Sequence, residues 1–565
     1  MRRAFVVALL AGIVGFPGVE RGNAEQVQFI PWPPLPAGTA RITGRVLNEA
    51  GRPAAGARVS LTLSTCRGPD CDTQYSPTET VSDAEGRFAF ANVGRVPVVV
   101  EAALTGFVTA QYGEAGPGLP GTPLAMRAGE KIDVVIRLTH GASVSGTVFD
   151  SQGALAAGIE VWAFRLRPEG GDEELIADSI STRTDETGQY RIAALPGGRY
   201  VICGGRIWGD HERPPIVEIA PGQLGFESDA SYPNGQWIND AEPFRLANDE
   251  ARAGVNLRLR MAPVTNVSGV VRTTDGKPVA RARVYLLDLD DPSPGSEGHW
   301  TDTGGRFRID RVEAGRYRVV AFDQSYPRLW GRADVESDGR VPTKLDLTVE
   351  PAGEIAGRII FDGRSAPPAA PVPVPPNWTK SVSLFVNATD GTAESPWSAT
   401  WDWSFPETFS APGIPQGRYS LSLDGAVGWW MRSQIVDGMD ALDHPFAIVG
   451  TETRFVTVTF TDKRTTIFGA VTNQMGQADA GVTVVVFSTD TSTWNGYSRR
   501  VAAVRPDQNG EWEVIGLPEG DYWVGLETPS LYGIPTPARL AELRAGARRV
   551  TLKEGERTTA NTRTR

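Results

Sequence analysis

Short stretches of alternating apolar and polar residues recur along most of the chain. A period of two buries one face of a strand and leaves the other in water. The clearest alternating sets are Tyr317, Val319 and Ala321; Tyr419, Leu421 and Leu423; and Tyr522, Val524 and Leu526. Helical spacing is confined to the short segment Ala538–Ala545. The pattern therefore predicts an all-β fold.

One strand pattern occurs five times, with a central glycine between apolar residues. The copies are Ile42–Val46, Val144–Val148, Val267–Val271, Ile355–Ile359 and Ile467–Val471. Their spacing matches the length of a small β-sandwich domain. The repetition predicts several similar domains in tandem.

Two turn motifs follow the glycine strand within the repeats. The first has aspartate, glycine and an aromatic residue in fixed order, as in Asp83–Phe88, Asp185–Tyr190 and Asp507–Trp512. Its aspartate is expected to bond the turn backbone, its glycine to reverse the chain, and its aromatic residue to begin an inward-facing strand. The second motif ends in tyrosine, as in Leu195–Tyr200, Val312–Tyr317, Ile414–Tyr419 and Leu517–Tyr522.

These motifs resemble the bacterial carboxypeptidase regulatory-like domain. The resemblance implies a transthyretin-like, or carbohydrate-binding-like, β-sandwich that accompanies other proteins as a non-catalytic module. The first unit departs from the pattern because Val93–Val98 replaces the tyrosine motif. The fourth lacks the aspartate turn before Phe409 and contains the proline-rich insertion Pro367–Pro376. The motifs consist of turn and core residues, so they carry little information about function.

The repeats divide the chain into an array of about five Ig-like or transthyretin-like β-sandwich domains. A signal peptide is expected over residues 1–24 and a proline-rich linker over 25–38. The expected domains are 39–140, 141–262, 263–352, 353–463 and 464–565, of which the fourth is divergent and rich in tryptophan.

The N-terminus has the features of a bacterial export signal. Arg2 and Arg3 precede the apolar segment Ala4–Phe16, and Gly22–Ala24 provides small residues at a cleavage site. The apolar segment is too short to span a bilayer, and no later segment is long enough. We therefore expect cleavage after Ala24 and a secreted or periplasmic mature chain without a transmembrane segment.

The net charge of −11 argues against a nucleic-acid partner, which requires a concentrated basic surface. Cys66 and Cys71 enclose a short loop, and an oxidising compartment would favour a disulfide between them. Cys203 is expected to be a structural thiol on a strand.

The sequence offers no convincing catalytic or metal constellation, so we expect neither an enzyme nor a cofactor. The four histidines, His140, His211, His299 and His444, are scattered and lack zinc-ligand spacing. A serine-nucleophile elbow and a phosphate-binding loop are also missing. Two acidic groups are either calcium-binding loops or solvated turns: Asp288, Asp290 and Asp291; and Asp437, Asp440 and Asp443.

Tryptophans are concentrated in the fourth unit. The candidates for ligand binding are Trp397, Trp401, Trp403, Trp429 and Trp430. Indoles on one strand face would stack on sugar rings; alternatively, they fill an enlarged core. Two functions follow. The chain is either a non-catalytic binding protein for a glycan or a cell-surface protein, or a structural spacer or assembly scaffold of the cell envelope.

Overall fold

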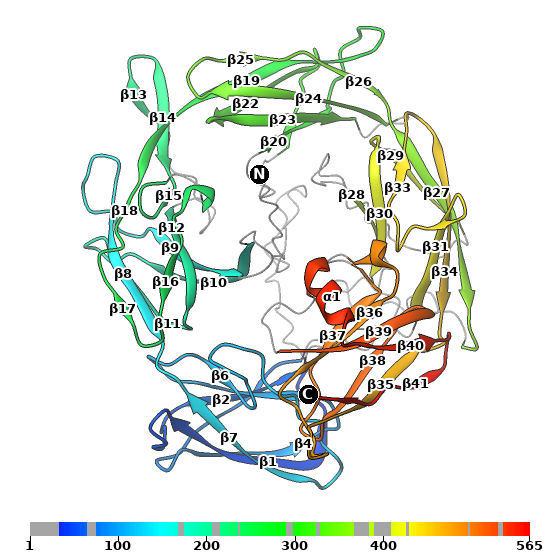
Figure 1. The fold of residues 1–565 in the computed structure, drawn as a ribbon. Coiled ribbons are helices and arrows are strands. Elements are labelled where there is room, and N and C mark those ends of the chain that lie inside the picture. The colour runs from blue at the N-terminus through cyan, green and yellow to red at the C-terminus, as the bar shows by residue number, and fades with distance from the viewer. Residues whose placement is uncertain are drawn as a thin grey trace, which may run out of the picture.

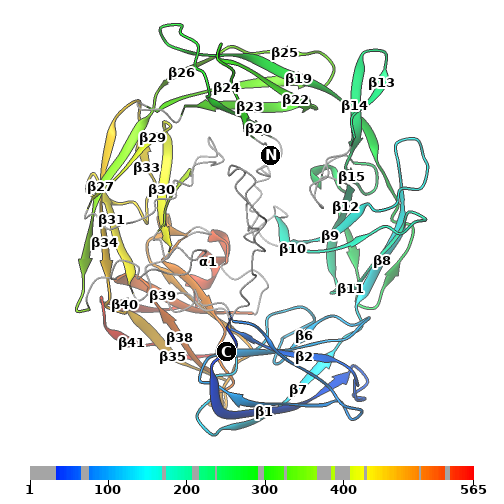
Figure 2. The same cartoon turned by 180° about the vertical axis from the view of Figure 1, so that it is seen from behind.

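The structure is a computed structural model. It describes residues 33–64, 75–167, 174–205, 215–235, 238–289, 298–323, 328–365, 383–388, 408–424, 429–494, 498–528 and 535–564. Five β-sandwich domains follow one another round a ring, and the fifth lies beside the first (Figure 1; Figure 2 from behind). The all-β array expected from the sequence is therefore confirmed. Within the described residues, no helix is long and apolar enough to cross a membrane.

Two sheets of the first domain enclose one core, with strand orders β4-β1-β7 and β3-β2-β5-β6. The strands are β1 (Ala37–Asn48), β2 (Arg58–Leu63), β3 (Thr78–Val81), β4 (Arg87–Val93), β5 (Val98–Ala103), β6 (Ala110–Gln111) and β7 (Lys131–Leu138).

The second domain has a sheet ordered β10-β9-β12-β15 packed against one ordered β11-β8-β17. Its elements are β8 (Ala142–Phe149), β9 (Glu160–Arg167), β10 (Glu174–Arg183), β11 (Gln189–Leu195), β12 (Gly198–Gly205), β15 (Ala230–Ser231), the 3-10 turn η2 (Ile238–Asp240), β16 (Phe244–Leu246), β17 (Ala251–Arg252) and β18 (Leu257–Arg258).

A hairpin that lies in the sequence range of the second domain extends a sheet of the third domain. The hairpin is β13 (Val217–Ala220) and β14 (Gln223–Ser228), and β14 pairs with the start of β19. The third domain contains β19 (Arg260–Thr273), β20 (Arg283–Asp288), β21 (His299–Trp300), β22 (Arg306–Val312), β23 (Ala314–Phe322), β24 (Leu329–Asp338), β25 (Thr343–Lys344) and β26 (Leu347–Pro351).

The fourth domain has sheets ordered β29-β27-β34-β31-β32 and β28-β30-β33. Its strands are β27 (Gly353–Asp362), β28 (Ser383–Ala388), β29 (Thr408–Ile414), β30 (Gly417–Asp424), β31 (Trp430–Val436), β32 (Met439–Asp440), β33 (Phe446–Ile448) and β34 (Thr453–Thr461).

The fifth domain has a sheet ordered β38-β35-β41, with β42 also on β35, and a second sheet ordered β37-β36-β39-β40. Its elements are β35 (Thr466–Thr472), β36 (Thr483–Ser488), the 3-10 turn η3 (Thr491–Thr493), β37 (Val501–Val504), β38 (Glu511–Ile515), β39 (Gly520–Glu527), helix α1 (Pro537–Arg544), β40 (Arg548–Leu552), β41 (Arg557–Thr559) and β42 (Thr562–Arg563).

Helix α1 occupies the segment for which the sequence predicts helical spacing. The Thr536 side chain caps its first turn by accepting from the Arg539 backbone N–H, and proline occupies the first helical position. Leu540 is buried, with Val485 and Phe487 in the same core cluster, so the helix covers the outer face of β36.

The repeated glycine sits opposite the repeated aromatic residue in every domain. The cross-strand pairs are Gly44 with Phe88, Gly146 with Tyr190, Gly269 with Phe307, Gly357 with Phe409, and Gly469 with Trp512. A Cβ on Gly357 would lie 2.2 Å from the Val456 carbonyl oxygen and 2.6 Å from the Phe409 ring. The glycine therefore allows close approach of both neighbours, and the divergent fourth domain retains this pair.

The aspartate turns form as the sequence predicts. The Asp507 Oδ1 accepts from the backbone N–H groups of Asn509 and Glu511, each at 2.8 Å. Gly510 has φ of 74°, a conformation that favours glycine. The Asp83 turn is built in the same way.

The repeated tyrosines lock the turn that precedes them. In four domains the phenol donates to the carbonyl four residues earlier. These bonds run from Tyr200 to Pro196 (2.7 Å), Tyr317 to Glu313 (3.3 Å), Tyr419 to Pro415 (2.9 Å) and Tyr522 to Pro518 (2.8 Å). All four rings are buried, so each satisfied hydroxyl avoids the cost of burying an unpaired polar group.

Short connections join consecutive domains. Residues 139–141 separate β7 from β8, and residues 462–465 separate β34 from β35. Only residue 259 separates β18 from β19, and only residue 352 separates β26 from β27. Connections this short restrict how far neighbouring domains can rotate.

Candidate functional site at the joint between the fourth and fifth domains

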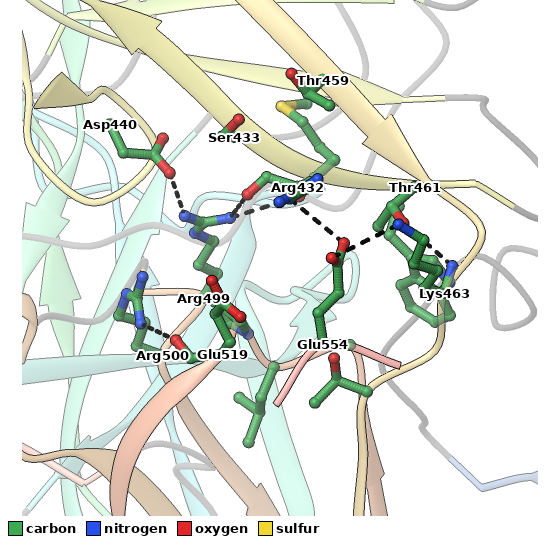
Figure 3. A pocket seen from close by; sticks show the side chains of 16 residues that line it. Arg432, Ser433, Asp440, Thr459, Thr461, Lys463, Arg499, Arg500, Glu519 and Glu554 are labelled. Carbon is green, nitrogen blue, oxygen red and sulfur yellow. Dashed lines mark hydrogen bonds and ion pairs between the residues drawn. The ribbon is translucent and has the colours of Figure 1, made fainter. Parts of the chain in front are cut away.

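A pocket of about 430 Å³ lies where the fourth domain meets the fifth (Figure 3). Strands β31 and β34 line one side, and the segments around Arg499, Leu517 and Glu554 line the other. Charged and hydroxyl side chains dominate the lining. They are Arg432, Ser433, Asp440, Thr459, Thr461, Lys463, Thr465, Arg499, Arg500, Glu519 and Glu554.

Arg499 carries the contact across this joint. It belongs to the fifth domain, and its Nη2 lies 2.7 Å from the Asp440 Oδ2 of the fourth. Its Nε lies 2.9 Å from the Asp443 Oδ1, and its Nη1 donates to the Arg432 carbonyl at 2.7 Å. One guanidinium thus binds two carboxylates and the backbone of the neighbouring domain, a geometry for which arginine is suited.

Arg500 reinforces the same carboxylate. Its Nε lies 2.7 Å from the Asp443 Oδ2. The Asp443 side chain is only 6% exposed. Burial alone would raise the Asp443 pKa, but the hydrogen bonds and charges of Arg499 and Arg500 outweigh it and hold the pKa below its ordinary value. Asp443 is therefore an ionised, buried part of the joint.

A second ion-pair group lies on the opposite side of the pocket. The Arg432 Nη1 contacts the Asp362 Oδ2 at 2.6 Å, and its Nε lies 3.4 Å from the Glu554 Oε1 of the fifth domain. The Lys463 Nζ lies 3.2 Å from Asp362 and 3.9 Å from Glu554. The charges lining the pocket are largely paired with one another.

Trp430 is the one aromatic residue of the pocket lining. Its half-buried ring packs on Gly516 of the fifth domain, where a Cβ would lie 2.8 Å from the indole. The Arg464 guanidinium lies 5.8 Å from its ring centre. The indole Nε1 is buried without a hydrogen-bond partner.

The other candidate tryptophans are placed differently. Trp429 is 6% exposed, and its ring meets Phe361 edge-on at 5.0 Å inside the core of the fourth domain. This position favours the core-filling alternative for Trp429. Trp397, Trp401 and Trp403 lie outside the described residues.

The acidic residues Asp437, Asp440 and Asp443 all form ion pairs with arginines, and only Asp437 is largely exposed to solvent. Asp437 pairs with Arg454 at 2.5 Å, while Asp440 and Asp443 hold Arg499. In the described part of the chain, no group of three or more potential ligands could hold a metal ion. Asp290 and Asp291 lie outside it. The arginine partners belong to segments distant in sequence, so the acidic spacing alone did not reveal them.

The predicted cysteine pair also lies outside the described residues, as does the signal peptide. Cys203 is a free thiol on β12. Burial, with a smaller contribution from the Asp229 charge, raises its pKa. A thiol of raised pKa is a poor nucleophile, which agrees with the expected structural role.

The fifth domain also meets the first, through a smaller contact. The Gln508 side chain accepts from the Ala125 N–H at 3.1 Å and donates to the Ala125 carbonyl at 3.0 Å. The Arg505 Nη2 donates to the Gly113 carbonyl at 3.2 Å. Burial lowers the Arg505 pKa, and the Arg505 Nε and Nη1 have no hydrogen-bond partner among the described residues.

Among the described residues, a single ion pair crosses this second contact. Arg127 and Glu511 lie 4.0 Å apart, with side chains 72% and 61% exposed. Exposed pairs of this kind contribute little. The ring is therefore closed by a few polar contacts.

Residues 41–139 and 266–350 match the family of carboxypeptidase regulatory-like domains. Halomucin of Haloquadratum walsbyi (strain DSM 16790 / HBSQ001) is 28% identical over 134 residues, which is 24% of this chain and 1% of halomucin. The chain thus matches only a small part of that relative's length.

Solved structures of pilins show some similarity. A streptococcal ancillary pilin has a TM-score of 0.23 and 12% identity, covering 55% of this chain and 99% of the pilin. GBS52, a minor pilin of Streptococcus agalactiae, has a TM-score of 0.23 and 11% identity, covering 38% of this chain and 98% of its own. The chain is thus an all-β repeat protein, of whose five β-sandwiches the first and the third match the family of carboxypeptidase regulatory-like domains.

Proposed function

We propose that this chain is a non-catalytic scaffold that works outside the cytoplasm and holds five β-sandwich domains in a closed ring. The observation that carries the proposal is the return of the fifth domain to the first through Gln508 and Arg505. A spacer would only need an extended array. A ring instead fixes the relative positions of surfaces on all five domains.

Three features support a fixed arrangement. The connections between domains are one to four residues long, as at 259, 352 and 462–465. Strand β14 pairs with β19, so one sheet continues across the junction of the second and third domains. Buried ion pairs centred on Arg499 hold the fourth and fifth domains together. The location outside the cytoplasm rests on the predicted signal peptide.

Crosslinking in intact cells tests both parts of the proposal. Cysteines replace Ala125 and Gln508, which touch across the closing contact, in a background that carries Cys66→Ser and Cys71→Ser. A short bismaleimide should join the two thiols. A membrane-impermeant maleimide added first should prevent this, because both thiols lie outside the cytoplasm.

The control pairs Ala125→Cys with Lys277→Cys, an exposed position in the third domain, and should give no intramolecular crosslink. Absence of the crosslink in the test pair would contradict the closed ring. A crosslink that persists after the impermeant reagent would contradict the location.

Glycan binding is a second candidate function, favoured by the surroundings of Trp430. Its indole lies in a pocket lined by groups of both charges and by hydroxyls. A neutral sugar needs a flat apolar surface together with hydrogen-bond donors and acceptors. Trp397, Trp401 and Trp403 remain candidates in the same domain.

A glycan array compares the parent with Trp430→Ala. Trp300→Ala is the matched control, because Trp300 is an exposed tryptophan of the third domain. Glycan retention by the parent and by the control, but not by Trp430→Ala, is the expected result. Retention by all three proteins, or by none, would reject this site.

A further inference from the structure

A second pocket, of about 500 Å³, lies in the fifth domain beside helix α1, away from the joint with the fourth domain. Figure 1 shows α1 above the sheet that contains β36 and β39. Residues of α1, β39, the start of β40 and the segment 561–564 line the pocket. No part of the proposed scaffold function uses it.

The pocket has an apolar floor because two strands end unequally. β40 begins at Arg548, which pairs with Val524 of β39. β39 continues to Glu527, so its last three residues have no partner on β40. Val524 is buried, and Leu526 packs against the same core. Leu543 of α1 also lines the pocket, but from the other face of β39, where it packs beside Gly525 and Phe487. Aliphatic surface thus reaches the mouth of the pocket.

Arg548 is placed at this mouth by the alternation of β40. It shares a strand face with the buried residues Val550 and Leu552, and it lines the pocket. Arg549 belongs to the opposite face and pairs with Asp521 at 2.7 Å. Two adjacent arginines therefore have different surroundings.

The charge of the pocket is not balanced within the described chain. Arg539 is neutralised by Glu527 and Glu542. Arg548 instead donates to the Asn561 carbonyl at 3.3 Å, and Arg563 donates from Nε to the Asn473 carbonyl at 3.1 Å and from Nη2 to the Gln474 carbonyl. Neither pairs with a carboxylate among the described residues, although the chain has a net charge of −11.

A hydroxyl adds to this unused capacity. The Thr562 Oγ1 is buried and has no hydrogen-bond partner among the described residues, and Thr562 lines the pocket. Guanidinium groups and a free hydroxyl are suitable donors for a carboxylate. An aliphatic floor beside them suits an apolar tail, since binding pockets combine apolar walls with a few convergent polar groups.

We propose that this pocket binds an amphipathic carboxylate. The apolar part lies over the edge of β39 that β40 leaves unpaired, against Leu526 on one face and Leu543 on the other, and the carboxylate lies between Arg548 and Arg563. The same chemistry is found in a fatty acid and in the C-terminal residue of a peptide, so the test includes one probe of each kind.

Isothermal titration calorimetry on the mature chain tests the site with decanoate, decan-1-ol and N-acetyl-phenylalanine. We expect one decanoate per chain and at least roughly tenfold weaker binding of decan-1-ol, because charge-assisted hydrogen bonds are worth about 1.5–3 kcal/mol each. Binding of N-acetyl-phenylalanine in preference to decanoate would identify a peptide terminus as the ligand type. Equal binding of the acid and the alcohol would overturn the proposal.

Substitutions then place the ligand. Arg548→Ala and Arg563→Ala should each weaken binding of the acid about tenfold or more, with the same thermal unfolding as the parent. Arg549→Ala is the matched control and should bind like the parent. Leu543→Ser should weaken the acid and the alcohol alike. Equal affinities of Arg548→Ala and Arg549→Ala, or no binding by the parent, would reject the site.

Discussion

The fifth domain meets its two neighbours by different physical means. Toward the fourth domain, Arg499 and Arg500 hold the buried Asp443 in a network of charge-assisted hydrogen bonds. Toward the first domain, Gln508 makes two neutral hydrogen bonds, and the one ion pair between described residues of the two domains, Arg127 with Glu511, is exposed. The comparison teaches that a ring needs only a weak final contact when its other joints already bring the ends together.

The largest effect is expected from Arg499→Ala. The change removes the Arg499 hydrogen bonds to Asp440 and to the buried Asp443, whereas Arg500 stays paired with Asp443. Each lost charge-assisted hydrogen bond is worth about 1.5–3 kcal/mol. Urea unfolding followed by tryptophan fluorescence should show that loss in the transition of the last two domains.

Arg454→Ala is the control, because its partner Asp437 belongs to the same acidic group but is 63% exposed. It should cost at most about 1 kcal/mol. Similar losses from both substitutions would contradict the special role of the Arg499 network.

Acid should weaken the strong joint. The folded-state pKa of Asp443 lies below its ordinary value of 3.8. Its ionisation therefore stabilises the joint above that value, and the contribution is lost as the pH falls through the lower folded-state pKa. Between pH 5 and pH 2, the thermal unfolding temperature should fall more steeply with decreasing pH for the parent than for Asp443→Asn. Identical pH profiles would count against the buried ion pair.

The first domain should respond to pH in the opposite direction. Glu114 follows Gly113, whose carbonyl receives Arg505, and burial raises the Glu114 pKa from 4.5 to about 7, with a smaller contribution from Glu101. The folded state then binds more protons between these values, so stability falls as the pH rises from 4.5 to 7. Glu114→Gln should weaken the dependence of the thermal unfolding temperature on pH between 4.5 and 7. An unchanged dependence would contradict a raised Glu114 pKa in the folded state.

A smaller effect is expected from Gln508→Ala. It removes two hydrogen bonds to Ala125, each worth about 0.5–1.5 kcal/mol. Differential scanning calorimetry should show a small decrease in the transition temperature of the first and fifth domains. Arg127→Ala should lower the transition temperature by still less. If Gln508→Ala destabilised the protein as much as Arg499→Ala, the contact of the fifth domain with the first would be as strong as its contact with the fourth.

The repeat residues made the fold predictable, because each acts locally. The turn aspartate bonds an N–H two residues away, and Tyr522 bonds a carbonyl four residues away. The need for glycine at position 357 is explained by the close approach of the two neighbouring strands alone. The fourth domain keeps the fold despite lacking the aspartate turn, because the glycine–aromatic pair survives there.

The joints were not predictable in the same way. Asp443 and Arg499 come from different domains, and nothing in the local pattern connects them. The acidic spacing therefore suggested calcium or a solvated turn. The crowding of Trp429 and Trp430 was visible in the sequence, but one residue lies in the core and the other lines a pocket between domains, a distinction that depends on strand register.

Small-angle X-ray scattering of the mature chain at neutral pH tests the closed ring most directly. An extended array of five domains, each with a radius of gyration of about 13 Å, would span on the order of 150 Å. We predict a compact particle whose pair-distance distribution matches the ring of Figure 1 and which becomes longer in Arg499→Ala. A parent protein with the dimensions of the extended array would contradict the account.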